Sequence, residues 1–121
     1  MKFEDKVPYP FVLDYLTGVD LVIKPMFGSY AIYATAKLCL FMIKRNMPLK
    51  TPDDKELENG VYMATRTDCK TDLMKLFPGA QFQQLKGEKA WIYFDENDTH
   101  FETYCASACE LIAKGDARIG R

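Results

Sequence analysis

The fold is decided by two neighbouring segments, Lys24-Pro25-Met26-Phe27-Gly28-Ser29-Tyr30-Ala31-Ile32-Tyr33 and Lys37-Leu38-Cys39-Leu40-Phe41-Met42-Ile43-Lys44. Their β-branched and aromatic content predicts two strands, roughly 26–33 and 37–44, joined by a short polar break. The second strand is apolar at nearly every position, which is typical of a central strand covered on both faces. A glycine inside a strand marks a bulge or a close approach of backbone or ligand, so Gly28 indicates an irregularity.

The segments on either side of this hairpin predict a helix and a third strand. Pro8 and Pro10 precede Phe11–Leu16, and proline is pre-organised for a first helical turn. A polar stretch from Arg45 to Gly60 predicts a long loop. The Asn59-Gly60 turn signal at its end leads into a short strand over 61–65.

The second half of the chain predicts a helix, a hairpin and a longer helix. Asp68 or Thr71 can cap the first of these helices, which Pro78-Gly79 closes. The hairpin pairs 81–85 with 90–94. In the last helix Thr99 and Glu102 form a capping box, and an apolar stripe then runs at i, i+3, i+4, i+7 spacing to Ile112.

This order of elements predicts an α+β fold. A single, mostly antiparallel sheet of about five strands packs against two or three helices, because hairpin connections imply antiparallel pairing. At 121 residues the chain is one domain, 1–121, and can bury roughly two-thirds of its unfolded surface.

Composition restricts the partners and the compartment. The formal net charge is −1, so composition gives no support to the clustered positive field that phosphate binding requires. No apolar leader follows the charged start, and the longest apolar run, 38–43, is too short to span a bilayer. A cytoplasmic protein is expected, with Cys39, Cys69, Cys105 and Cys109 as free thiols.

Met26-Phe27-Gly28, with Tyr30, Tyr33 and Lys37, resembles the N-terminal domain family of TfoX/Sxy, bacterial proteins associated with competence regulation. Trp91 and the ending 116–121 support this resemblance, which covers most of the chain in order. It implies a stand-alone TfoX N-terminal-like domain with a regulatory role. The YjbR/MmcQ-like family, whose members have been regarded as DNA binders, shares a similar order of elements and is the second choice.

The chain departs from the TfoX/Sxy pattern in the first hairpin. Ser29 and Ala31 stand where the family has glycine, and Thr35-Ala36 replaces an Asp-Gly turn. Thr and Ala resist the positive φ of a two-residue type I′ turn, so a looser or longer hairpin is expected. The 121 residues also leave no room for the family's second domain, so its regulatory role is not expected to transfer whole.

Two sets of residues around the first hairpin are candidate sites. A ligand or interaction site is predicted at Met26, Phe27, Gly28 and Tyr30, because the glycine permits a close approach. Basic residues interleaved with aromatics can bind single-stranded nucleic acid, and that contact is predicted at Lys24, Lys37, Lys44 and Arg45. The competing interpretation of these charges is protection of strand ends against edge-to-edge association.

Catalytic and metal signatures are weaker. Cys105 and Cys109 share a helical face but lack a second ligand pair, so no metal is predicted. His100 and the acidic residues 95–98 show no nucleophile signature and no calcium-loop spacing. No cofactor is predicted, and no catalytic residue is assigned. Trp91 is expected to anchor the core or an interface.

These observations favour a non-enzymatic regulatory or protein-interaction module with an unidentified protein partner. The alternatives are a nucleic-acid-binding module of transcription or competence regulation, and a thiol-dependent enzyme, which the sequence supports least. The apolar strands also leave open a homodimer formed through a sheet edge.

Overall fold

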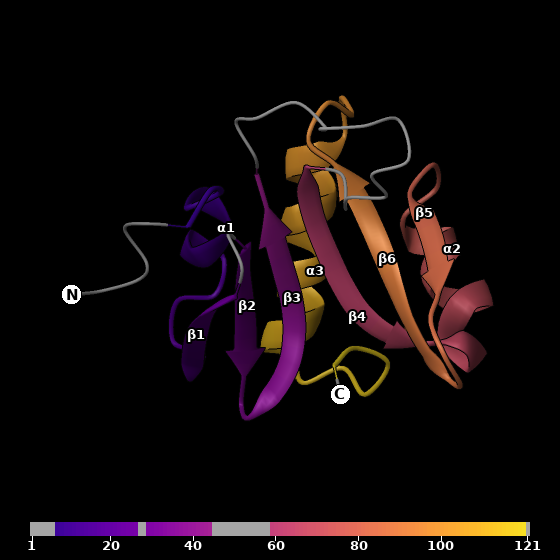
Figure 1. Ribbon diagram of the computed structural model, residues 1–121, viewed down its shortest axis with the longest axis horizontal. Helices are drawn as coiled ribbons and strands as arrows, with labels where there is room; N and C mark the ends of the chain where they lie inside the picture. Colours follow the sequence, from indigo (N-terminus) through magenta and orange to yellow (C-terminus); the bar gives the residue numbers. More distant parts are fainter. Residues whose placement is uncertain (1–6, 27–28, 45–58, 121) are drawn as a thin grey trace.

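Most of the described chain belongs to one sheet. The computed structural model describes residues 7–26, 29–44 and 59–120 (Figure 1). In this part the strands are β1 (Leu21–Met26), β2 (Ser29–Ala34), β3 (Lys37–Ile43), β4 (Gly60–Arg66), β5 (Gln81–Gln84) and β6 (Lys89–Asp95). Their order is β1-β2-β3-β4-β6-β5, and every neighbouring pair is antiparallel.

The predicted α+β class is therefore confirmed, with six strands among the described residues in place of about five. The strand that sequence reasoning missed is β1, which lies at one edge and contains Pro25. An edge strand tolerates proline because one row of its N–H groups needs no partner in the sheet. The central position predicted for 37–44 is also confirmed, since β3 lies between β2 and β4.

The three α-helices of the described residues pack on the same face of the sheet. They are α1 (Phe11–Asp14), α2 (Lys70–Leu76), which follows the short 3-10 helix η2 (Thr67–Cys69), and α3 (Phe101–Ala113). Figure 1 shows α3 lying behind the sheet. The side chains of this main core come from all three helices and from the strands, and include Val12, Leu16, Ile32, Leu40, Met42, Val61, Met63, Leu73, Phe77, Ile92 and Phe94.

The apolar stripe predicted for the last helix is confirmed, but its predicted cap is wrong. The buried positions of α3 are Phe101, Tyr104, Cys105, Ala108, Cys109 and Ile112. His100, not Thr99, is the N-cap, and it makes no side-chain cap hydrogen bond. The His100 N–H instead donates to Asp98 Oδ1 at 2.8 Å. The side chain of Asp98 thus accepts a backbone hydrogen bond in the turn before the helix. The spacing of Thr99 and Glu102 does not produce a capping box.

The turn between β2 and β3 is tighter than the sequence predicted. Ala34 pairs with Lys37, so the connection has two residues, and Thr35 and Ala36 have φ values of 50° and 67°. The predicted looser or longer hairpin is therefore wrong. The strands on both sides fix the turn, and the Thr35 N–H donates to the Asp20 carbonyl oxygen at 2.9 Å. Tertiary pairing here outweighs a local penalty of about 1–2 kcal/mol per residue.

The irregularity of this hairpin lies in β3. Ile32 pairs with Leu40 and Tyr33 with Leu38, which leaves Cys39 as an extra residue. Such a bulge increases the local twist and bends the strand. Gly28, where the sequence predicted an irregularity, lies outside the described residues.

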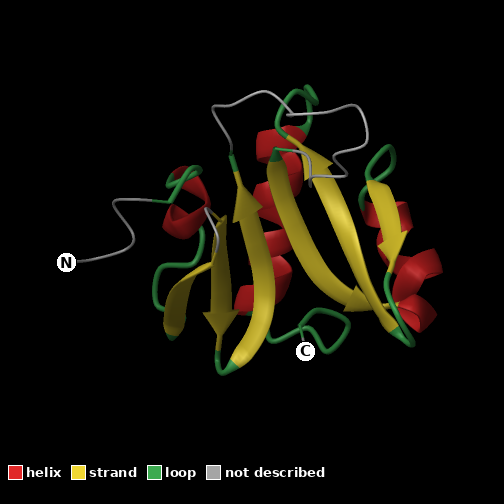
Figure 2. Cartoon of the chain, in the orientation of Figure 1, coloured by secondary structure: helices red, strands yellow, loops and turns green. Residues whose placement is uncertain are grey.

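Beyond the bulge β3 and β4 diverge, and the C-terminal segment lies between them (Figure 2). Their pairing ends at Leu40 and Met63, and the Ala64 carbonyl oxygen accepts from the Gly120 N–H at 2.9 Å instead. The Thr65 hydroxyl donates to the Arg118 carbonyl oxygen at 2.7 Å. The segment 116–120 therefore completes the backbone hydrogen bonding of β4 where the sheet opens.

Candidate functional site

The second face of the sheet carries no helix among the described residues, and we call it the open face. Because side chains alternate along a strand, the neighbours of the main-core residues point to this face. Its described residues include Val22, Lys24, Ala31, Tyr33, Leu38, Phe41, Ile43, Tyr62, Ala64, Gln81, Gln83, Trp91 and Tyr93.

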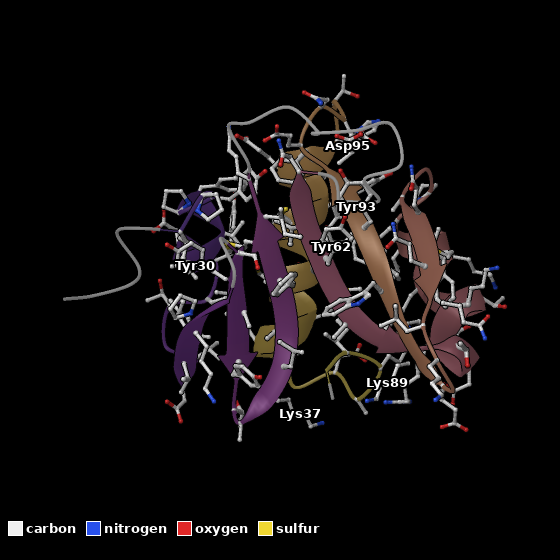
Figure 3. The ribbon with its side chains drawn as sticks, in the orientation of Figure 1. Tyr30, Lys37, Tyr62, Lys89, Tyr93 and Asp95 are labelled. Atoms are coloured by element: carbon white, nitrogen blue, oxygen red, sulfur yellow. The ribbon has the colours of Figure 1, made fainter. Side chains whose placement is uncertain are left out.

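An aromatic cluster occupies the middle of the open face. The rings of Tyr62 and Tyr93 stack with their centroids 4.6 Å apart, and Figure 3 shows them side by side on β4 and β6. Trp91 meets Tyr62 edge-on at 6.2 Å and Phe41 at 6.0 Å. With Ile43 these residues form a second apolar cluster, separate from the main core. Cross-strand aromatic pairs of this kind stabilise a sheet face by about 0.2–1 kcal/mol each.

Gly60 makes room for this cluster. A Cβ on Gly60 would lie 2.2 Å from the Phe94 carbonyl oxygen and 2.7 Å from Cε1 of Tyr93. The ring of Tyr93 therefore lies across the start of β4, where any side chain would displace it. The Tyr93 hydroxyl donates to the Asn59 carbonyl oxygen at 2.6 Å, which fixes the ring in place. The Asn59-Gly60 pair, which the sequence indicated as a turn, therefore lets the Tyr93 ring pack closely against the start of β4.

Exposure changes across the cluster. Ile43, Tyr62 and Tyr93 are at most 2% exposed, whereas Phe41 and Trp91 are only partly buried. A partly exposed aromatic pair on a sheet face offers large apolar contact area at low conformational cost, which is typical of interface anchors. Trp91 therefore lies in a second cluster outside the main core, at a position suited to the interface role expected from the sequence.

The structure separates the basic residues predicted to contact nucleic acid. Lys37 and Lys44 lie at opposite ends of β3, about 23 Å apart at 3.3 Å per residue. Lys44 pairs with Glu96 at 3.5 Å, and the Nζ of Lys24 lies 5.0 Å from the centre of the Tyr33 ring. Arg45 lies outside the described residues. The described members of this set do not form one patch.

The predicted ligand site around Gly28 is described only in part. Phe27 and Gly28 lie outside the described residues, and of Met26 the structure gives the backbone, paired with Ser29. Tyr30 packs against the main core on the covered face, and Figure 3 shows it on β2 at a distance from Tyr62 and Tyr93. Tyr30 thus lies on the opposite face from the aromatic cluster.

Four buried thiols line the covered face and its ends. Cys39, Cys69, Cys105 and Cys109 are all free, as expected. Burial raises the pKa of the Cys109 thiol to about 12, with the neighbouring Cys39 adding to the effect. Burial raises the pKa of Cys105 as well, with Cys109 and Glu102 as further causes. Protonated, enclosed thiols are poor nucleophiles at neutral pH, so this geometry is unsuited to thiol catalysis.

His100 and the nearby acidic residues are engaged in the turn before α3. Asp95 Oδ1 accepts from the Asn97 N–H at 2.9 Å, and Asp98 caps His100 as described above. His100 is exposed. Within residues 7–26, 29–44 and 59–120, no group of three His, Cys, Asp or Glu side chains is arranged to hold a metal ion.

A third acidic residue, Glu96, joins a network at the upper end of the sheet. The Tyr9 hydroxyl lies 2.8 Å from Glu96 Oε2 and 3.0 Å from the Ile43 carbonyl oxygen. Burial, with the hydrogen bond to Glu96, raises the pKa of Tyr9 far above its usual range. The tyrosine stays neutral and ties the chain before α1 to the ends of β3 and β6.

Sequence reasoning missed the surface that tertiary structure assembles. The alternation of Trp91 with Tyr93, and the position of Tyr62 between buried neighbours, was a usable signal for a second apolar face. The cationic residues at the lower end of the sheet, Arg66, Lys86 and Lys89, carried no such signal because they are distant in sequence from Lys37.

The fold and this surface define a small α+β domain whose sheet has one helix-covered face and one open aromatic face. No family model, curated protein or solved structure matches this chain. In the described part of the chain, no helix is long and apolar enough to cross a membrane.

Proposed function

We propose that this chain is a non-enzymatic regulatory module that binds a cytoplasmic protein partner through its open face. The observation that carries the proposal is the pair of partly exposed aromatic side chains, Phe41 and Trp91, in contact on a sheet face without a described helix. The buried cluster of Tyr62 and Tyr93 beneath them gives the pair a rigid support. The resemblance of Met26-Phe27-Gly28 to the TfoX/Sxy N-terminal domains supports a regulatory context.

The charges around the pair indicate the chemistry of the partner. Lys24, Arg66 and Lys89 lie on the same face, against Asp95 at its upper end. A partner with an apolar patch flanked by carboxylates would be complementary to this pattern, since rim charges set orientation and association rate.

A pull-down from the native cells with cross-linking tests the proposal. Phe41→Ala and Trp91→Ala should each lose the proteins that the wild-type chain captures, because truncating an aromatic anchor costs about 2 kcal/mol or more of binding free energy. Leu76→Ala is the matched control, since Leu76 is 47% exposed on α2, away from the open face. Capture that is unchanged in both aromatic variants would contradict the proposal.

Two further outcomes would also contradict it. A specific turnover by the purified protein that is lost on changing one polar residue would show an enzyme. A concentration-dependent dimer that Phe41→Ala dissolves would assign the open face to a second copy of this chain.

A second candidate function is the binding of single-stranded nucleic acid on the same face. Aromatic side chains on an open sheet can stack bases at about 1–3 kcal/mol per base, and Lys89 and Arg66 lie beside Trp91 on this face. Trp91 is the only tryptophan in the chain, so its fluorescence reports on stacking. Quenching by an oligonucleotide that persists at physiological salt, and weakens in an Arg66→Glu/Lys89→Glu variant, would favour this candidate.

A further inference from the structure

A concave site lies at the lower end of the sheet, where β3 and β4 diverge, and we call it the basal pocket. Its volume is about 500 Å³, and its lining includes Lys37, Arg66, Lys86, Glu88, Lys89 and Gly120. These residues come from the start of β3, the end of β4, the β5–β6 turn and the C-terminal segment. Figure 3 shows Lys37 and Lys89 on either side of the C-terminal loop.

Four of these lining residues are cationic and one is acidic. Lys37, Lys86 and Lys89 are exposed, and within the described part of the chain they form no ion pair. Cations that converge on a concavity with few carboxylates repel one another, and they attract a counter-ion. The chain as a whole has a net charge of −1, so this concentration of positive charge is local.

Arg66 is held in place by its surroundings. Its Nη1 donates to the Ala117 carbonyl oxygen at 3.1 Å, and its Nε lies 3.4 Å from Asp68 Oδ1. The segment that carries Ala117 is itself fixed by the Thr65–Arg118 hydrogen bond at 2.7 Å. The pocket therefore combines one positioned guanidinium with three exposed ammonium groups, the two types of donor that proteins use for phosphate oxygens.

The shape of the site distinguishes two possible phosphate ligands, a single-stranded nucleic acid and a small phosphate-bearing molecule. An extended single strand needs a basic track along its backbone, whereas Lys24 and Lys44 lie elsewhere and contact Tyr33 and Glu96. The basal pocket is an open hollow to which four separate segments of the fold contribute residues, and its size falls within the range of small-molecule sites. Its four cations, set against the one carboxylate of Glu88, leave a positive charge of the size that a di- or triphosphate group neutralises.

We propose that the basal pocket binds the phosphate groups of a small di- or triphosphate-bearing molecule. Phe41 and Trp91 do not line this pocket, whereas Arg66 and Lys89 belong both to the pocket and to the charged rim of the proposed partner surface.

Calorimetric titration with inorganic tripolyphosphate tests this site, first in low salt and then at physiological salt. The wild-type chain should bind one equivalent saturably, and a Lys86→Glu/Lys89→Glu double variant should bind at least tenfold more weakly. A Lys37→Gln variant, which removes one cation at the opposite wall, should weaken binding severalfold. Sulfate at the same ionic strength should compete poorly.

The matched control is Lys75→Glu with Lys114→Glu, which makes the same change of net charge on exposed lysines of α2 and after α3. It should leave tripolyphosphate binding unchanged. Thermal unfolding confirms that each variant is folded. Lack of saturable binding, or equal weakening in the control, would overturn the proposal. So would tighter binding of a twelve-nucleotide single strand at these same lysines, which would identify a nucleic-acid backbone as the source of phosphate.

Discussion

The two faces of the sheet are built from the same strands but bury their side chains in different ways. On β6, Ile92 and Phe94 point to the covered face, where three helices close over them. Trp91 and Tyr93, which alternate with them along the strand, point to the open face. There the rings of neighbouring strands lie against one another, and Tyr93 is still only 1% exposed.

The difference shows two routes to a stable sheet surface. On the covered face, a second layer of helices removes the apolar side chains of the strands from water. Large aromatic rings can shield each other by lying across adjacent strands, and they leave some apolar area available for a partner. The covered face thus specifies the fold, and the open face adds stability while Phe41 and Trp91 stay partly exposed.

The most direct way to break the open face is to fill the space that Gly60 leaves. Gly60→Ala should destabilise the protein by about 4 kcal/mol or prevent folding, because its Cβ would clash with the backbone of β6 and the ring of Tyr93. Chemical denaturation measures the loss. Gly18→Ala is the control: both glycines have a positive φ, 154° at Gly60 and 87° at Gly18, but a Cβ added at Gly18 would meet nothing within 4 Å. It should cost only about 1 kcal/mol. Equal effects of the two changes would refute the close-approach argument.

Adjacent residues on β6 compare the two faces directly. Ile92→Ala should cost about 3 kcal/mol, because it leaves a cavity in the main core at a fully buried position. Trp91→Ala should cost about half as much, since Trp91 is already partly exposed. Partner capture should respond in the opposite order, with Trp91→Ala the more damaging at a temperature where both variants are folded. The same order in both assays would show that the open face is only structural.

The C-terminal segment tests how the covered face is closed at its lower end. Thr65→Val should cost about 1–2 kcal/mol, because it leaves the Arg118 carbonyl oxygen without its 2.7 Å donor in a partly buried setting. Hydrogen exchange at the Gly120 amide should accelerate in this variant. Thr17→Val is the control, since the Thr17 hydroxyl bonds the Asp14 carbonyl oxygen at an exposed site. A similar loss of stability in both variants would argue against a special role for the segment.

The smallest predicted effect is a dependence of folding stability on pH below about 4. The hydrogen bond and ion pair with Arg118, 2.7 Å away, lower the pKa of Asp116 to about 2 from its ordinary 3.8. Because the folded-state pKa is the lower one, this contribution is complete above about pH 4 and is lost as the pH falls toward 2. It amounts to about 1 kcal/mol after solvent screening.

Denaturation of the wild type and Asp116→Asn across pH 2–5 measures this contribution. The difference in unfolding free energy between them should shrink as the pH falls. A constant difference would show that the pair stabilises the segment through geometry and not through charge.

Local patterns in the sequence predicted much of this molecule. The apolar stripe of α3, the hairpin of β5 and β6 and the central position of β3 follow from periodicities of 3.6 and 2, which each element carries within itself. The α+β class follows from the order of those elements. β1 was missed because Pro25 interrupts the pattern, although an edge strand accommodates it.

Only the tertiary structure decided which residues meet. The Thr35-Ala36 turn, the close approach at Gly60 and the convergence of Lys37 with Arg66, Lys86 and Lys89 depend on strand order, on the bulge at Cys39 and on the divergence of β3 from β4. These are contacts between segments far apart in the chain, and no local pattern encodes them. The sequence by itself therefore determined the elements and the class of the fold, and the long-range packing of the sheet decided its surfaces.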